Sequence, residues 1–128
     1  MKNKVFLILL LFPLMLSCGQ NVEDVYSNVT LNAVCGDMQL PAIRVDNSVK
    51  GNYFSNLNTG EKYDYPLFVN GKCTLKVLKG VYIFAFDGTA TLTDGSIRRV
   101  RCYEHRSPND SVNILDDDVE ITFELLSL

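Results

Sequence analysis

Apolar residues recur at every second position in several short stretches of this chain, a period typical of β-strands rather than of helices. Apolar and polar side chains alternate from Asn28 to Val34, from Cys73 to Val77 and from Val119 to Leu125. Such alternation places one face of a strand in a core and leaves the other in solvent. No stretch keeps a helical period over three turns. The pattern therefore predicts an all-β domain.

The stretch Asn70–Phe86 stands out because two different strand patterns meet in it. Cys73 to Val77 alternates, whereas Val81–Phe86 is apolar at every position and rich in β-branched and aromatic residues, as expected of a strand covered on both faces. Lys79 and Gly80 separate the two. We predict a hairpin here, with Gly80 at a positive φ in the turn.

Turn signals divide the rest of the chain. Asp87-Gly88 predicts a turn, and Asp94-Gly95 is the strongest two-residue hairpin signal, joining Thr89–Thr93 to a partner strand at Ser96–Glu104. His105 to Asp118 is predicted to be a long polar loop. About seven or eight short strands at this spacing predict an antiparallel β-sandwich spanning residues 28–128.

The N-terminus carries a targeting segment. Lys2 and Lys4 precede the apolar run Val5–Leu16, and the small residue Ser17 stands before Cys18. The run is short for a membrane span, so residues 1–17 are predicted to be a signal peptide. We expect residues 18–27 to form a polar tether.

The junction Leu14–Gly19 resembles a bacterial lipobox, with Met15 at a position where Leu is usual. The resemblance implies that Cys18 is lipidated after cleavage and anchors the protein in the outer membrane, facing the periplasm or the cell surface. Ordinary secretion, with Cys18 unmodified, is the alternative. The acidic pair Glu23-Asp24 fits a short solvated tether, and the alternative is a surface-export signal, since the pair resembles the signal found in Bacteroidetes lipoproteins.

The net charge of the chain limits the classes of partner that the sequence predicts. The chain has 12 basic and 15 acidic residues, and removing Lys2 and Lys4 leaves 10 basic residues and a net charge of −5. Phosphate backbones require a basic surface, so we expect no nucleic-acid partner for a chain with this net charge. The membrane is the expected partner, through the lipid on Cys18.

The pattern Gly71-x-Cys73-x-Leu75-x-Val77-x-x-Gly80-x-Tyr82-x-Phe84 resembles the core signature of prealbumin-like β-sandwiches, which include Cna B-type repeats and carboxypeptidase regulatory-like domains. Cys73 departs from that signature, in which an aromatic residue is common. The resemblance implies a non-catalytic scaffold that serves as a stalk, pilus component or accessory binding module.

Aromatic residues gather in the irregular stretch Asn52–Tyr65, as Tyr53, Phe54, Tyr63 and Tyr65. Aromatic rings beside Asn and Asp side chains are suited to holding sugars, which makes this end of the domain our predicted binding surface for a glycan or protein partner. The alternative is that the rings pack against the end of the sandwich, with the Tyr hydroxyls in solvent.

Catalytic and metal-binding signals are weak. His105 is the one histidine and has no paired nucleophile nearby, and the run Asp116–Asp118 lacks the spacing of a calcium loop. We therefore expect no enzyme activity, no metal and no cofactor. Apart from Cys18, the cysteines lie on the apolar side of strands and are expected to be buried small side chains: Cys35, Cys73 and Cys102. The alternative is one disulfide between two of them, with the pairing left open.

Asp110-Ser111-Val112 resembles the three-residue O-glycosylation motif of secreted Bacteroidetes proteins, which makes Ser111 a candidate modification site. The leading functional hypothesis is a lipid-anchored binding or structural module that serves surface assembly, adhesion or glycan uptake. The alternative is an inhibitor of a secreted peptidase that uses Asn52–Tyr65 as its inserted loop.

Overall fold

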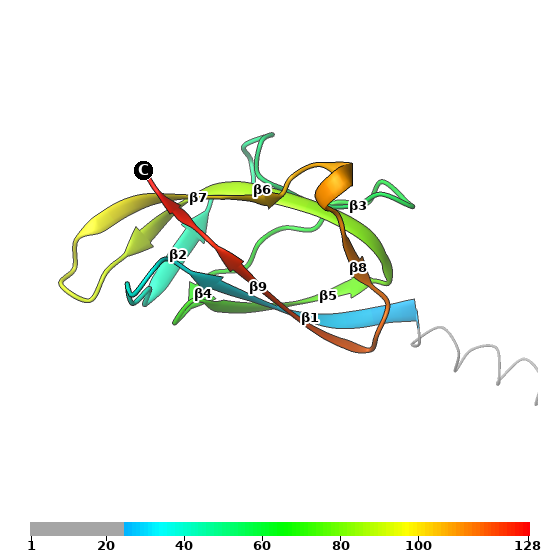
Figure 1. The fold of residues 1–128 in the computed structure, drawn as a ribbon, viewed down its shortest axis with the longest axis horizontal. Helices are drawn as coiled ribbons and strands as arrows, with labels where there is room; N and C mark the ends of the chain where they lie inside the picture. Colours follow the sequence, from blue (N-terminus) through cyan, green and yellow to red (C-terminus); the bar gives the residue numbers. More distant parts are fainter. Residues whose placement is uncertain (1–24) are drawn as a thin grey trace, which may run out of the picture.

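The computed structural model describes residues 25–128, and this part of the chain forms ten β-strands and a short 3₁₀ helix, η2 (Pro108–Asp110) (Figure 1). The prediction of an all-β domain is confirmed, with more strands than expected. In chain order the strands are β1 (Tyr26–Val34), β2 (Ala42–Val45), β3 (Tyr53–Asn56), β4 (Phe68–Val69), β5 (Lys72–Leu78), β6 (Gly80–Thr91), β7 (Ile97–His105), β8 (Val112–Ile114), β9 (Asp118–Glu124) and β10 (Leu126–Ser127).

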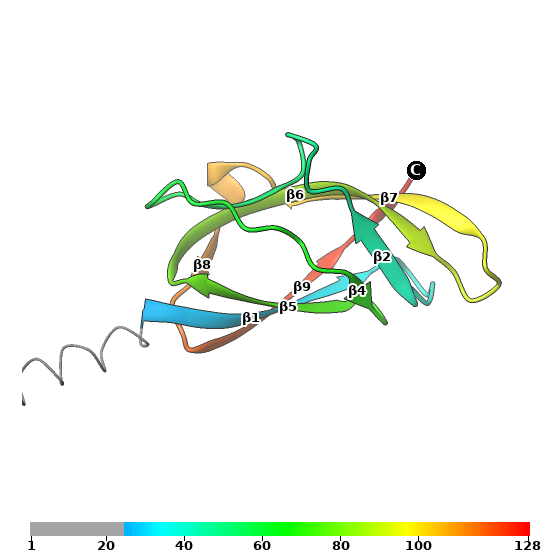
Figure 2. The same ribbon diagram turned by 180° about the vertical axis from the view of Figure 1, so that it is seen from behind.

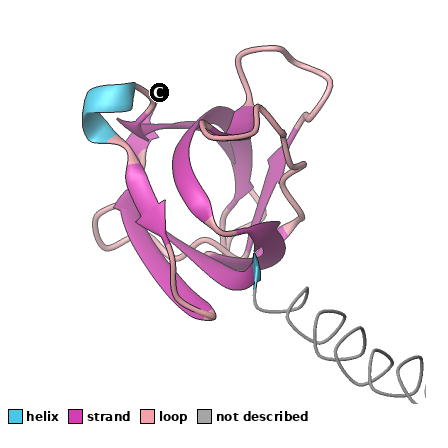
Figure 3. Ribbon diagram, turned by 90° about the vertical axis from the view of Figure 1, so that its right-hand side faces the viewer, coloured by secondary structure: helices cyan, strands magenta, loops and turns pink. Residues whose placement is uncertain are grey.

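All ten strands belong to one sheet, in the order β10-β7-β6-β2-β4-β5-β1-β9, with β3 and β8 also paired to β6. The sheet curls around an interior (Figure 3). Strands β1, β5 and β9 form one layer, and β6 and β7 form the layer that faces it (Figures 1 and 2). The chain therefore builds a sandwich-like core from a single curled sheet.

One strand pair departs from the predicted antiparallel arrangement. β1 and β9 run parallel, in a register that extends from Asn28 opposite Asp118 to Val34 opposite Glu124. The two strands are separated by most of the domain, so no tight turn dictates their relative direction. β1 also begins at Tyr26, so the strand includes the last two residues of the predicted tether.

The predicted hairpin between residues 73–77 and 81–86 is wrong. β5 pairs with β1 and β4, whereas β6 pairs with β2, β3, β7 and β8. Between β5 and β6 the chain crosses from one layer to the other (Figure 1). The backbone N–H of Lys79 donates to Val25 O at 2.7 Å. Alternation reports which face of a strand is buried, but it does not report which strand is its neighbour.

The turn chemistry is confirmed at one site and wrong at two others. Gly95 (φ 83°) lies in the predicted turn between β6 and β7. A turn that was not predicted joins β4 to β5, with Asn70 (φ 52°) and Gly71 (φ 79°) at its centre. Gly80 does not have a positive φ. Asp87-Gly88 does not turn the chain, because β6 continues through it to Thr91.

The interior is filled by one apolar cluster. In β6 the even-numbered side chains point inward, so Tyr82, Phe84 and Phe86 are buried, whereas Val81 and Ile83 on the other face are only half-buried. The expectation that this strand is covered on both faces is therefore wrong. Burying one large apolar side chain contributes about 1.5–3 kcal/mol. The largest fully buried rings are Phe54, Phe68, Tyr82, Phe84, Phe86 and Phe123.

The cysteines of the described part follow the prediction. Cys35, Cys73 and Cys102 are all buried and unpaired. Burial raises the pKa of the Cys73 thiol to about 12, and burial, reinforced by the charge of Glu104, raises the pKa of the Cys102 thiol to about 12. Both thiols therefore behave as small apolar groups.

Candidate functional site

Two of the four aromatic residues predicted to form a binding surface belong to the core. Phe54 is 0% exposed and Tyr65 is 4% exposed. The ring of Phe54 lies 5.3 Å from that of Phe84, and the hydroxyl of Tyr65 donates to the backbone carbonyl of Tyr53. The prediction of an exposed surface is therefore wrong for these two residues. Side chains alternate between the two faces of β3, and Phe54 lies on the inward face. The side chain of Asn47 binds the backbone of Tyr65 and holds that residue against the core.

Tyr63 ties its loop to the sheet. Its hydroxyl accepts a hydrogen bond from Leu78 N at 3.1 Å and donates to Glu61 Oε2 at 3.0 Å. Burial raises the pKa of Tyr63. The ring also packs against the core, 6.3 Å from that of Tyr82. Tyr63 is therefore a structural anchor of the loop.

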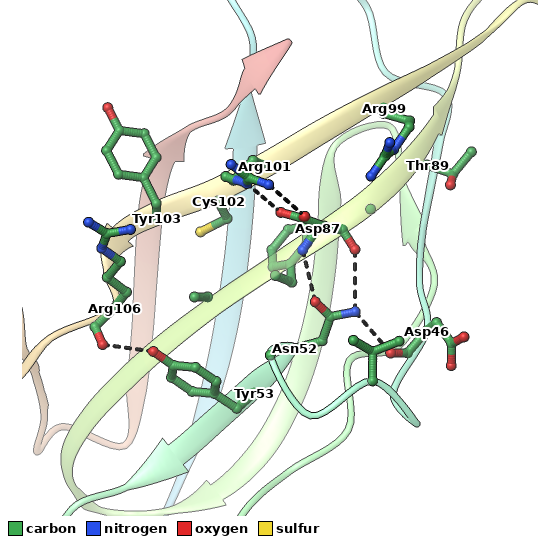
Figure 4. A pocket seen from close by; sticks show the side chains of 15 residues that line it. Asp46, Asn52, Tyr53, Asp87, Thr89, Arg99, Arg101, Cys102, Tyr103 and Arg106 are labelled. Atoms are coloured by element: carbon green, nitrogen blue, oxygen red, sulfur yellow. Dashed lines mark hydrogen bonds and ion pairs between the residues drawn. The ribbon is translucent and has the colours of Figure 1, made fainter. Parts of the chain in front are cut away.

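Tyr53 is the predicted binding residue that lines a cavity. A groove of about 550 Å³ lies between the β2–β3 loop and the outward face of β6 and β7 (Figure 4). Tyr53 stands at one end of it, and its hydroxyl donates to Arg106 O at 2.7 Å. We call this cavity the β6–β7 groove.

Strand alternation determines which side chains form the floor of the β6–β7 groove. Asp87 pairs in register with Arg101, and Thr89 pairs with Arg99. Residues directly opposite on antiparallel strands share a face, so all four side chains point outward together. Val100 and Cys102, which alternate with these arginines along β7, point into the core. The groove floor is therefore a polar row on the outer surface of an apolar layer.

An ion pair lies at the centre of the groove. Arg101 Nε and Nη2 donate to Asp87 Oδ1 and Oδ2 at 2.7 and 2.9 Å, a bidentate geometry (Figure 4). The hydrogen bonds from Arg101, helped by the nearby charge of Arg99, hold the pKa of Asp87 below its usual range. Asp87 therefore stays ionised and keeps Arg101 oriented along the floor.

The wall of the groove is held by side-chain amides. Asn52 Nδ2 donates to Asp46 O at 2.9 Å, and Asn52 Oδ1 accepts from Asp87 N at 2.9 Å. Asn47 binds the backbone of Tyr65 in the same way, with its Nδ2 on Tyr65 O at 3.0 Å and its Oδ1 on Tyr65 N at 2.7 Å. The β2–β3 loop is thereby fastened to β6 and to the segment before β4.

The other chemical candidates lie outside this groove. His105 Nδ1 is 2.9 Å from Asp110 O, and its ring lies 5.0 Å from that of Phe84. Asp117 pairs with Lys79 at 2.6 Å. Among residues 25–128, no group of three or more His, Cys, Asp or Glu side chains is placed to hold a metal ion. The predicted polar loop from His105 to Asp118 contains η2 and β8, so it is more regular than expected.

Ser111 follows η2 and is partly exposed, with its backbone N–H donating to Pro108 O at 3.4 Å. Its glycosylation stays a prediction. Cys18 and the signal peptide lie outside the described residues, so the lipidation site also stays a prediction. Within the described range, no helix has the length and apolar character needed to cross a membrane.

No protein-family model, curated protein or solved structure matches this chain. The likeness to prealbumin-like sandwiches stays a prediction. Sequence reasoning missed the arginines of the groove, although a signal for them exists: four of the five arginines in the chain fall between residues 98 and 106. Alternation within Ser96–Glu104 places Arg99 and Arg101 on one face of the strand, but it does not show that this face borders a groove.

Proposed function

We propose that this protein is an outer-membrane or cell-surface lipoprotein whose β-sheet domain is a non-catalytic binding module. The lipobox-like junction Leu14–Gly19 supports the anchor. The observation that carries the binding role is the β6–β7 groove, a concave surface in which Arg101, Asn52 and Tyr53 are already held in place by hydrogen bonds. Preorganised polar groups on a rigid sheet bind a ligand with little loss of side-chain entropy.

The tether supports the same arrangement. Only Gly19–Val25 would separate a lipid on Cys18 from the start of β1 at Tyr26. An extended chain reaches at most about 3.6 Å per residue, so these seven residues would keep the domain within about 25 Å of the anchor. β1 belongs to one layer and the groove lies on the outer side of the other layer (Figures 1 and 4). The groove would therefore stay open to ligands.

The anchor is tested by replacing the predicted lipidation site. We expect Cys18→Ala to move the protein from the detergent-extracted membrane fraction to the soluble fraction, and we expect the mature wild type to carry the mass of acyl chains. Cys35→Ala is the matched control, because it removes a buried cysteine and should leave the protein in the membrane. Unchanged membrane association of Cys18→Ala would contradict the proposal.

A second candidate function, inhibition of a secreted peptidase, is favoured by the turn after β3. Leu57 is 43% exposed at this turn. Asn56 Oδ1 accepts from Asn58 N at 2.8 Å, and Asn58 Oδ1 accepts from Val81 N at 2.8 Å. A rigid, exposed turn is what an inhibitory loop requires. Titration of secreted peptidases with the purified protein tests this, and inhibition that is lost in Leu57→Ala would support it.

A further inference from the structure

Positive charge is concentrated around the β6–β7 groove in a chain that is acidic as a whole. The net charge of the full sequence is −3, yet Arg99, Arg101 and Arg106 all line the groove. Arg44, which is exposed on β2, extends this surface: it pairs in register with Thr89, and Thr89 pairs with Arg99. The three residues form one row across three strands, so their side chains share the outward face.

The acidic residues of the groove are already engaged. Asp87 is paired with Arg101. Asp46 Oδ1 accepts hydrogen bonds from Ser48 Oγ at 2.6 Å and from Ser48 N at 3.0 Å, which lower the pKa of Asp46 and turn its carboxylate toward its own loop. The carboxylates of Asp87 and Asp46 therefore already bind Arg101 and Ser48 within the groove and its loop.

Two guanidinium groups remain available. Arg99 forms no ion pair with any residue in the described range, and Arg106 makes a single ring contact, 5.9 Å from the centroid of Tyr103. Figure 4 shows them at opposite ends of the groove, with the Asp87–Arg101 pair between them. Two separated free cations suit an elongated ligand with more than one negative group.

The floor of the groove offers side chains and no backbone. β6 is paired with β7 on one edge and with β2 and β3 on the other, and Asn52 fills the interval between those two strands. β7 is paired with β10 at Val100 and Arg101. An extended peptide could not add a strand to β6, because both edges of that strand are paired. Recognition must come from guanidinium, carboxylate, hydroxyl and aromatic groups.

We propose that the β6–β7 groove binds an acidic glycan, with Arg99 and Arg106 each holding a uronic acid carboxylate. This inference rests on the proposed function as a binding module and names its ligand class. Thr89 and the Asp87 oxygens would accept hydrogen bonds from sugar hydroxyls, which a plain polyanion lacks. Tyr53, fixed by its bond to Arg106, and Tyr103, which is 40% exposed, offer rings to the apolar faces of sugars.

The test is calorimetric titration of the purified protein, in detergent if it fractionates with membranes, against short oligogalacturonates. We expect saturable binding that weakens as salt is added. A fully methyl-esterified oligogalacturonate, which keeps the hydroxyls and loses the charges, should bind at least about tenfold more weakly, since it cannot form charge-assisted hydrogen bonds with the guanidinium groups. A polyglutamate peptide should bind no better than the ester.

Variants assign the binding to the groove. We expect Arg99→Ala/Arg106→Ala to lower the affinity at least about tenfold, and Arg99→Gln/Arg106→Gln, which keeps more of the side-chain packing, to do the same. Lys76→Ala is the matched control: it removes one exposed positive charge from β5, in the other layer, and should change the affinity less than twofold. Denaturation curves verify that each variant is folded.

No binding of the oligogalacturonate, equal binding of its methyl ester, binding of polyglutamate alone, or unchanged affinity in the arginine variants would overturn the inference. The anchor is judged separately. If the wild type is soluble and binds the oligogalacturonate, the proposed anchor is refuted and the proposed ligand is supported. If the protein is bound to the membrane and does not bind the oligogalacturonate, the ligand is refuted and the anchor is supported.

Discussion

The side chain of Asn52 replaces a strand backbone beside Asp87. Asn52 Oδ1 accepts a hydrogen bond from Asp87 N at 2.9 Å, and Asn52 Nδ2 donates to Asp87 O at 3.4 Å. This contact falls where β2 has ended, with Val45 opposite Gly88, and β3 is about to begin, with Tyr53 opposite Ala85. The carboxamide thus carries the hydrogen-bond ladder of β6 across the interval between two short strands.

Removing this carboxamide should destabilise the domain. We expect Asn52→Ala to lower the free energy of unfolding by about 1–3 kcal/mol, because the N–H of Asp87 would lose its partner in a partly buried position. Urea denaturation measures the effect. Asn109→Ala is the control, since Asn109 is exposed on η2 and should change stability by less than about 0.5 kcal/mol. Equal stability of the two variants would mean that water replaces the amide without cost.

Gly80 is required for close packing rather than for a special φ. A Cβ at this position would lie 2.7 Å from Asn58 Oδ1 and 2.8 Å from Asn56 Nδ2. Neither amide is free to move, because Asn58 Oδ1 accepts from Val81 N and Asn56 Nδ2 donates to the Tyr82 hydroxyl. We expect Gly80→Ala to cost about 1–3 kcal/mol in urea denaturation.

Gly51 provides the matched comparison for that substitution. It has open space where a Cβ would stand and no positive φ. We expect Gly51→Ala to leave stability unchanged or to raise it by up to about 1 kcal/mol, because the unfolded chain loses freedom. If Gly80→Ala were as stable as Gly51→Ala, the two Asn side chains would have to move apart at no cost.

Buried thiols should make the domain sensitive to alkali. The pKa values of Cys73 and Cys102 rise from 9.0 to about 12 on folding, mainly through burial, so the folded state retains protons that the unfolded state loses. The stabilisation is complete below pH 9 and decreases as the pH rises from 9 toward 12. Each thiol should contribute a loss of up to about 1.4 kcal/mol per pH unit in that window.

Urea denaturation at pH 7 and at pH 10 measures this loss. In Cys73→Ala/Cys102→Ala, the difference in the free energy of unfolding between the two pH values should shrink, whatever the stability of the variant at pH 7. The raised pKa values of Tyr65 and Tyr82, caused first by burial, leave a residual dependence at higher pH. An unchanged difference in the double variant would show that the thiols are not responsible.

The sequence predicts the faces of the strands better than their neighbours. Alternation correctly placed Val29, Val77 and Phe123 in the core, since the side-chain period of a strand is local. Asp94-Gly95 correctly marked a turn, because a positive φ is also a local requirement. The pairing of β1 with β9 could not be predicted, because it depends on the closure of the whole sheet.

The groove was harder to predict, because its wall is held by side chains whose partners are distant in the sequence. Asn47 and Asn52 are common types of turn residue, and nothing in their local sequence shows that Asn47 binds the backbone of Tyr65 or that Asn52 binds β6. Tyr53 lines the β6–β7 groove, and its role in binding stays a prediction, whereas Phe54 and Tyr65 are buried. The presence of an aromatic ring in the sequence does not show whether the residue packs in the core or binds a ligand.

The most direct test of a binding module centred on the β6–β7 groove is an NMR titration that follows the Arg Nε–Hε signals of the folded protein as oligogalacturonate is added. The account predicts that the signals of Arg99 and Arg106 shift in a saturable way, that Arg101 shifts less because Asp87 already holds it, and that the methyl-esterified ligand shifts none of them. Shifts confined to the turn at Leu57–Gly60, or no shift at any arginine, would contradict it.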